Sequence, residues 1–199
     1  AGHDPVEAVL AAVEGGVTTV QVREKYAPGR EILAYTEALA ERLPDRVSLI
    51  VNDRVDVFLA ARRRGAKVDG VHIGQRDLPV DEVRELVGPD AVIGLSAGKA
   101  EYLAAAAASS VRIDYVGIGP VHATTSKADA AEPLGVTKAV ELVGGAPVPA
   151  VAIGGITPPD VVPLRSGGFD GVAVVSWICG AADPAAAARA LVEQTESVR

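Results

Sequence analysis

Short apolar segments rich in Val and Ile recur along the chain at intervals of roughly 20 to 30 residues. Their apolar residues are continuous rather than alternating, which is typical of strands buried on both faces of a parallel sheet. Seven strands are therefore predicted, over residues 18–22, 48–51, 70–73, 92–95, 115–118, 149–153 and 171–175.

Segments with helix start and stop signals lie between these strands. Asp4-Pro5 and Asp183-Pro184 each place a capping side chain before a proline, which is favoured at the first helical position. Residues 79–87 carry valines on one face and are followed by a glycine, a common helix stop. Eight helices are predicted, beginning near Pro5, Gly29, Arg54, Pro79, Lys99, Gly135, Pro158 and Pro184.

Seven strands thus alternate with eight helices, and the first element is a helix. This order predicts an α/β fold, a (β/α)8 TIM barrel whose first strand is missing from the sequence shown, with one domain over residues 1–199. An open doubly wound sheet is the alternative, because periodicity does not reveal whether a sheet closes. The barrel is preferred, since eight similar units suit closure and no Gly-x-Gly-x-x-Gly motif follows a strand.

Composition narrows the classes of partner and compartment. The 199 residues include 19 Lys and Arg against 26 Asp and Glu, a net charge of -7, which argues against nucleic acid as the main partner. No apolar run approaches the ~18 residues of a membrane span. Cys179 is the single cysteine and no targeting segment is visible, so we expect a cytoplasmic protein with small-molecule partners. Association into homo-oligomers is left open.

Polar residues follow the strands at their carboxyl ends, where the active site of a barrel forms. The first strand leads into Gln21, Arg23 and Lys25, which alternation places on one side. Cations in a barrel interior are costly unless they meet an anion, so these residues predict an anion site. A structural pairing of Arg23 with a carboxylate such as Asp53 is the alternative.

Two carboxylates follow the next two strands. Adjacent parallel strands lie about 4.8 Å apart, so Asp53 and Asp77 can converge on one hard cation. Mg²⁺ usually takes one or two protein carboxylates and completes its shell with water and phosphate. The spacing therefore predicts a Mg²⁺ site, although Asp77, before Leu78-Pro79, is an equally good helix cap.

A second anion site is predicted where the last two strands end. Gly154-Gly155 and Val175-Ser176 each precede a helix start, so two helix N-termini can face one phosphate. A phosphate site after strands seven and eight is common in barrels. The alternative is a structural turn.

Hydroxyl side chains add to this picture. Ser96 ends a strand, and residues 124–127 combine three hydroxyls with a lysine, which suits a flexible phosphate clamp or an ordinary solvated turn. The two anion sites together predict an enzyme that acts on two phosphorylated small molecules or on one bisphosphate.

Seven motifs in order resemble the thiamine-phosphate synthase family. They are QVREK at 21–25, VNDRVDV at 51–57, GVHIGQRDLP at 70–79, IGLSA at 93–97, GIGPVHATTSKADA at 117–130, AIGGI at 152–156 and GVAVVS at 171–176. The resemblance implies a transferase of thiamine biosynthesis that uses Mg²⁺. It couples 4-amino-5-hydroxymethyl-2-methylpyrimidine diphosphate with hydroxyethylthiazole phosphate and releases diphosphate.

The resemblance also implies a role for each site residue, in a dissociative substitution in which Arg23, Lys25 and Lys127 neutralise the leaving diphosphate. The residues implied to bind the pyrimidine diphosphate are Gln21, Val22, Arg23, Glu24, Lys25, Asn52, Ser96 and Lys127. Those implied to bind the thiazole phosphate are Thr124, Thr125, Ser126, Gly155, Val175 and Ser176. Asp53 and Asp77 are implied to bind the metal.

Two other functions are weighed against the synthase. A thiazole tautomerase shares the barrel, but the resemblance implies that it carries a histidine in place of Pro120 and lacks the aspartate pair. A phosphate-binding barrel without turnover is the second, and the complete set of charged site residues argues against it.

Four residues in or next to the motifs are given no role in the chemistry. His122 is expected to be a solvated bystander in its loop, and His72 a core histidine with satisfied hydrogen bonds. Trp177 and Cys179 are expected to serve in packing.

The resemblance further implies a short strand before Ala1, and the sequence contains no Met. We expect that strand in the gene product, because the strands at Thr18 and Gly171 would otherwise be neighbours with exposed edges. Mass spectrometry checks this expectation. An intact mass of 20.3 kDa from a folded, monomeric and active sample would contradict it.

Overall fold

The computed structural model describes residues 4–124 and 132–198. All seven predicted strands are present, and none extends more than one residue beyond its predicted range. They are β1 (Thr19–Val22), β2 (Ser48–Asn52), β3 (Gly70–Ile73), β4 (Val92–Ser96), β5 (Tyr115–Ile118), β6 (Ala150–Ile153) and β7 (Gly171–Ala173).

The eight predicted helices are also present, each beginning at the predicted residue or one residue later. They are α1 (Pro5–Glu14), α2 (Gly29–Arg42), α3 (Val55–Arg63), α4 (Val80–Val87), α5 (Ala100–Ala107), α6 (Gly135–Val143), α7 (Pro158–Ser166) and α9 (Pro184–Glu196). A short helix that was not predicted, α8 (Ser176–Cys179), follows β7. In the described part of the chain, no helix is long and apolar enough to cross a membrane.

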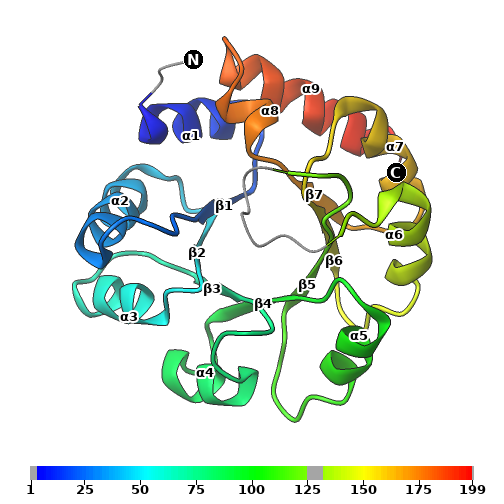
Figure 1. Cartoon of the computed structure of the whole chain (residues 1–199). Helices are drawn as coiled ribbons and strands as arrows, with labels where there is room; N and C mark the ends of the chain where they lie inside the picture. The colour runs from blue at the N-terminus through cyan, green and yellow to red at the C-terminus, as the bar shows by residue number, and fades with distance from the viewer. Residues whose placement is uncertain (1–3, 125–131, 199) are drawn as a thin grey trace.

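The strands form one parallel sheet in the order β1-β2-β3-β4-β5-β6-β7. Each strand pairs with its neighbour in sequence, so the strand order never reverses, which excludes the doubly wound alternative. The sheet curls around a central axis with the helices outside it (Figure 1). Among the described residues, no strand pairs with the outer edge of β1 or of β7. The fold is therefore a curled seven-stranded α/β sheet.

Helices α1 and α9 lie side by side next to β1 and β7, the two edges of the sheet (Figure 1). Their close approach depends on small residues. A Cβ atom at Gly15 would lie 2.4 Å from the carbonyl oxygen of Ala185 and 2.6 Å from the Cβ of Ala188. The alanine residues of α9 thus provide a surface on which the end of α1 packs at backbone distance.

Three aspartates fix the register at the amino ends of alternate strands. Each aspartate lies directly before its strand and binds one residue of the preceding strand twice. The aspartate amide donates to the carbonyl of that residue, and the aspartate carboxylate accepts from its N–H. The amide of Leu49 donates to the Asp69 carboxylate (2.7 Å), that of Ile93 to Asp114 (2.8 Å) and that of Ala150 to Asp170 (2.8 Å). The amides of the three aspartates donate to the carbonyls of Leu49, Ile93 and Ala150.

Arg84 joins the end of α4 to the starts of β4 and β5. Its guanidinium donates to the carbonyls of Gly88 (2.9 Å), Ala91 (2.6 Å) and Arg112 (2.8 Å), and to the Asp114 carboxylate (3.2 Å). Its side chain is only 11% exposed. Loss of this group would remove the Arg84 donor from three carbonyl oxygens, two of them partly buried, and one of the donors from the Asp114 carboxylate, which keeps its bonds from Ile93 and Arg112.

We expect Arg84→Ala to lower the free energy of unfolding by about 2–4 kcal/mol, because partly buried acceptors would lose their bonds. Arg112→Ala is the matched control, since Arg112 binds the same Asp114 carboxylate at 2.9 Å but is 57% exposed. We expect it to cost less than about 1 kcal/mol. Urea unfolding of both variants measures the difference, and equal losses would contradict a structural role specific to Arg84.

Candidate active site

The cationic half of the site lies where β1 and β2 end. Val22 pairs with Val51 in the parallel register, so Arg23 and Asn52 follow at the same level of the sheet. Asp53 comes next, and both Lys25 and Arg23 lie near enough to lower its pKa electrostatically. The structure therefore brings together the positive and negative groups that the sequence placed at these strand ends.

Asp53 adopts a left-handed backbone conformation, with φ 58°. Aspartate tolerates this region better than most residues. Its amide donates to the carbonyl of His72 on β3 at 2.8 Å, which extends the pairing of β2 with β3 by one residue. The turn thus places the Asp53 carboxyl beside the loop that follows β3.

The Asp77 carboxyl comes from that loop and lies close enough to the Asp53 carboxyl to raise its pKa. Burial raises the pKa of Asp53, and the charge of Asp77 raises it further, while Lys25 and Arg23 oppose the shift. Two carboxyl groups held this close favour a shared proton or a bound cation.

The helix-cap alternative for Asp77 is wrong. The α4 helix begins at Val80, and the residue in the N-cap position is Pro79. Asp77 instead accepts a hydrogen bond from the amide of Gly74 at 2.6 Å and so closes its own turn. Its carboxyl faces the end of β2 because of this turn.

The donor set fits Mg²⁺ as far as the described residues show. In this part of the chain, no group of three or more His, Cys, Asp or Glu side chains could hold a metal, so the candidate site offers two carboxylates. Two carboxylates with room for water and substrate phosphate are the usual protein contribution to a Mg²⁺ shell, whereas zinc sites use more protein ligands.

A polar network crosses the interior below the strand ends. His72 on β3 is buried, with Nδ1 2.9 Å from the Tyr115 hydroxyl and Nε2 3.0 Å from the Ser96 hydroxyl. The expectation of a core histidine with satisfied hydrogen bonds is confirmed. Burial raises the pKa of Tyr115 to about 12, and Gln21 on β1 forms a side-chain bond to it. Gln21 and Ser96 are thus linked through buried groups.

The second half of the site is an open pocket of about 480 Å³. It lies between the starts of α7 and α8, and the loop after β5 forms its third side. The lining residues are Ala123, Thr124, Gly155, Ile156, Thr157, Pro158, Ser176 and Trp177. None of them is Lys or Arg, so the lining offers an anion backbone amides and hydroxyl groups.

Gly155 is required at the floor of this pocket. It has φ 66°, and a Cβ atom there would lie 2.8 Å from the carbonyl oxygen of Ala123 and 2.9 Å from the Cβ of His122. The β6–α7 turn and the loop after β5 therefore pack directly on each other. A side chain at residue 155 would push the two walls of the pocket apart.

Several predicted residues lie elsewhere or beyond the described residues. Thr125, Ser126 and Lys127 fall outside the described residues. Glu24 is exposed and accepts a hydrogen bond from the amide of Tyr26 in its own loop at 2.9 Å. Val175 is exposed next to the start of α8, beside the pocket rather than in its lining.

Two residues gain roles that the sequence did not reveal. Trp177 packs partly against the core, as expected, and also lines the pocket. His122 is not a solvated bystander, because its Nε2 lies 2.9 Å from Oδ1 of Asp160 on α7. Trp177 could have been found as the residue after Ser176 on a helix start, but nothing local pairs His122 with Asp160.

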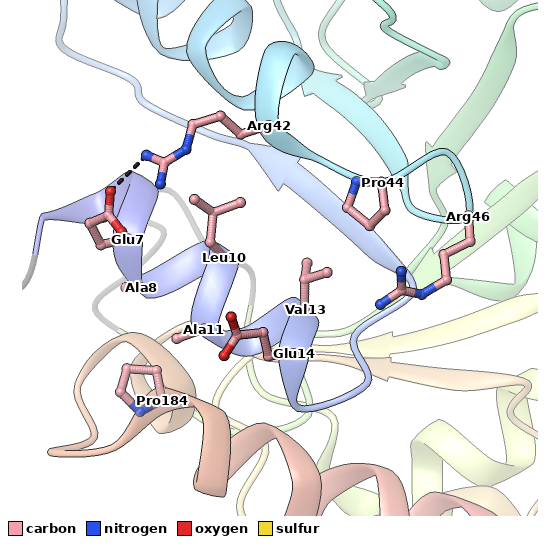
Figure 2. A pocket seen from close by; sticks show the side chains of 10 residues that line it. All are labelled: Glu7, Ala8, Leu10, Ala11, Val13, Glu14, Arg42, Pro44, Arg46 and Pro184. Atoms are coloured by element: carbon pink, nitrogen blue, oxygen red, sulfur yellow. Dashed lines mark hydrogen bonds and ion pairs between the residues drawn. The ribbon is translucent and has the colours of Figure 1, made fainter.

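A larger hollow of about 650 Å³ lies away from the candidate site (Figure 2). It is bounded by α1, by the segment that connects α2 to β2 at the amino end of that strand, and by Pro184. An ion pair between Arg42 and Glu7, 2.6 Å long, spans one side of it. None of its lining residues is a predicted site residue.

Comparison with known proteins identifies relatives over nearly the whole chain. The model of the thiamine monophosphate synthase family matches residues 2–178. A protein named thiamine-phosphate synthase from Corynebacterium efficiens is 44% identical over 94% of this chain and 87% of its own length. One with the same name from Moorella thermoacetica is 40% identical over 100% of this chain and 91% of its own length.

A solved structure agrees with these sequence relatives. The thiamine phosphate pyrophosphorylase from Pyrococcus furiosus superposes with a TM-score of 0.84 at 33% identity. The match covers 98% of this chain and 91% of that one. The two chains therefore share one fold over nearly their whole lengths.

We expect Asp53→Asn to raise the stability of the metal-free protein at neutral pH. The pKa of Asp53 lies above its ordinary 3.8 in the folded state, so the folded state holds this proton more tightly than the unfolded state. Ionised Asp53 therefore costs stability above its folded pKa, and that cost disappears as the pH falls through the folded pKa towards 3.8. Asparagine keeps the left-handed turn without the charge.

The expected gain at pH ~7 is about 1 kcal/mol after solvent screening, or ~2–4 °C in Tm. Thermal unfolding in a chelator at neutral and acidic pH measures it. Asp56→Asn is the control of opposite sign, because the hydrogen bond from Arg54 lowers the pKa of Asp56 and its charge stabilises the fold. A lower Tm for Asp53→Asn at neutral pH would contradict the electrostatic cost.

Proposed function

This chain belongs to the thiamine monophosphate synthase family, and we propose that the two halves of its site hold one substrate each. The activity is that of a transferase, thiamine-phosphate synthase. It joins 4-amino-5-hydroxymethyl-2-methylpyrimidine diphosphate to hydroxyethylthiazole phosphate and yields thiamine phosphate and diphosphate. One observation supports the division best: a carboxylate pair flanked by cations and a cation-free, amide-lined pocket lie at the same end of one sheet.

The diphosphate is assigned to the cationic half. Arg23 and Lys25 follow β1 and would neutralise its charge, with Asn52 beside them at the end of β2. Gln21 and Ser96, tied together through Tyr115 and His72, are placed to orient the pyrimidine ring. The remaining residues assigned to this substrate are Val22, Glu24 and Lys127.

Asp53 and Asp77 are proposed to hold Mg²⁺ between the protein and the diphosphate. Bound there, Mg²⁺ supplies positive charge to the oxygens of the leaving group. A cation held by the two carboxylates would offset the repulsion from Asp77 that helps to raise the pKa of Asp53.

The thiazole phosphate is assigned to the amide-lined pocket. Ser176 is the first residue of α8, and Gly155 and Ile156 lie in the turn before α7, whose first two residues are prolines without an N–H. The backbone amides assigned to the phosphate are therefore those of the turn before α7 and of the start of α8. Thr124 adds a hydroxyl from the opposite wall. The further residues assigned to this phosphate are Thr125, Ser126 and Val175.

The chemistry follows from this placement. The bond between the pyrimidine methylene carbon and the diphosphate oxygen breaks, and the diphosphate leaves with the electron pair. The pyrimidine ring stabilises the resulting carbocation, and the lone pair of the thiazole nitrogen then forms the new C–N bond. No proton moves in either step, so the chain supplies charge neutralisation and close positioning rather than a general base. Arg23, Lys25 and Lys127 carry the neutralising role.

The alternatives find less support in this site. The tautomerase interpretation requires a histidine where this chain has Pro120, and it has no use for the Asp53–Asp77 pair. A binding barrel without turnover has no need of two carboxyl groups held together at a cost in stability.

The finer architecture is part of the proposal. An eighth parallel strand between β1 and β7 would satisfy the outer edges of both and complete a (β/α)8 barrel. Closure would fix the distance between the two halves of the site.

We expect the protein to release diphosphate only when both substrates and Mg²⁺ are present. Asp53→Ala and Asp77→Ala should each lower kcat/KM by ~10²–10³-fold, because the leaving group loses its charge stabilisation. Asp81→Ala is the control, since Asp81 is an exposed residue in the first turn of α4. Far-UV circular dichroism should be the same for all three variants. Absence of Mg²⁺-dependent release from the unaltered protein would refute the metal assignment.

A further inference from the structure

We propose that His122 is a positioning residue for the thiazole phosphate. Held by Asp160, it fixes the loop after β5 against the turn between β6 and α7, and so sets the spacing between two walls of the phosphate pocket. This inference rests on the function proposed above, because it concerns the pocket assigned to that substrate.

The His122 side chain ends on a carboxylate that already holds the start of α7. Asp160 Oδ2 accepts from the amide of Thr157 at 2.8 Å and from its hydroxyl at 2.6 Å, which forms a capping box. Asp160 Oδ1 receives His122 Nε2 at 2.9 Å. One carboxylate therefore connects His122 with Thr157.

The ionisation of the Asp160 carboxyl decides which group donates in this contact. Burial acts to raise the pKa of Asp160, but the hydrogen bonds from Thr157 and His122 outweigh it and hold that pKa below its ordinary value. The carboxylate is therefore ionised and can only accept hydrogen bonds. His122 must carry its proton on Nε2, and the contact is a charge-assisted hydrogen bond.

Backbone contacts hold the chain on both sides of the pocket up to His122. The His122 amide donates to the carbonyl of Gly154 at 2.9 Å, and that of Val121 donates to Ile153 at 3.0 Å. At Gly155 the two loops already touch. After His122, however, the chain continues into Ala123 and Thr124, which form the third side of the pocket. The side chain of His122 connects this segment to α7 through its bond to Asp160.

Binding of the phosphate depends on the spacing between the pocket walls more strongly here than it would in a pocket lined by Lys or Arg. None of the lining residues is Lys or Arg, so binding of the phosphate depends on where the amides and hydroxyls point. The strength of a hydrogen bond falls steeply when donor and acceptor are misaligned, whereas the electrostatic attraction between a phosphate and a lysine or arginine falls slowly with distance. Thr124 lines the pocket from the loop after β5, and Gly155 and Ile156 line it from the turn before α7. The His122–Asp160 bond adds a side-chain connection between these two segments.

The experiment compares His122→Asn with His122→Gln in the full chain. The amide nitrogen of glutamine can reach the place of Nε2 and keep the bond to Asp160, whereas the shorter asparagine side chain cannot. We expect His122→Asn to raise KM for the thiazole phosphate about 5–30-fold and to leave KM for the pyrimidine diphosphate within about twofold. His122→Gln should restore most of the loss. Glu132→Ala, an exposed change after the loop, should have no effect.

Each other outcome overturns the inference. Equal kinetics for His122→Asn and His122→Gln would show that the bond to Asp160 has no positioning role. An equal rise of both KM values, or unfolding of His122→Asn at the assay temperature, would show that His122 serves the fold as a whole. Failure of the unaltered protein to make thiamine phosphate would instead refute the proposed function, and these results are therefore distinguishable.

Discussion

Every strand in this sheet runs parallel to its neighbour, and this constraint places the whole site. Parallel pairing brings the carboxyl ends of all seven strands to the same end of the sheet, so residues far apart in sequence share a small region. The three aspartates before β3, β5 and β7 secure this arrangement from the opposite end, because each holds two backbone groups of the preceding strand. The register of the sheet is therefore fixed at the amino ends of the strands, away from the candidate site. The carboxyl ends can then carry polar residues and residues with a strained backbone.

Two different electrostatic arrangements result at that end. At β2 and β3, two carboxyl groups are held together at the cost of a raised pKa for Asp53, with Arg23 and Lys25 near enough to offset part of it. At β6 and β7, the described lining contains no Lys or Arg, and it offers backbone amides and hydroxyl groups instead. The first arrangement suits a highly charged ligand that brings or shares a cation. The second suits a smaller anion that the backbone can surround.

The sequence predicts the elements well because their signals are local. Apolar segments buried on both faces mark the strands, and capping residues such as Asp4 and Asp183 mark helix starts, which the structure confirms. The meeting of Asp53 with Asp77 could also be predicted, since neighbouring parallel strands leave few other positions for them. The bond from His122 to Asp160 could not, because it joins residues 38 positions apart through side chains whose directions depend on the packed loops. The cap alternative for Asp77 is wrong because Pro79 occupies the N-cap position of α4, which begins at Val80, and the Asp77 carboxyl closes its own turn instead.

The two halves of the site belong to opposite ends of the strand order, β1 to β3 on one side and β5 to β7 on the other. Strand pairing alone would let them drift apart, since a parallel sheet can be flat or curled. What holds the ends of this sheet towards each other in the described chain is the contact of α1 with α9, which lie next to β1 and β7 (Figure 1). That contact depends on Gly15 against Ala185 and Ala188, where no Cβ atom fits at residue 15. A small-residue contact on the outside of the fold therefore helps to set the distance between the two halves of the candidate site, and in the proposed reaction the carbon and nitrogen can meet only if that distance is right.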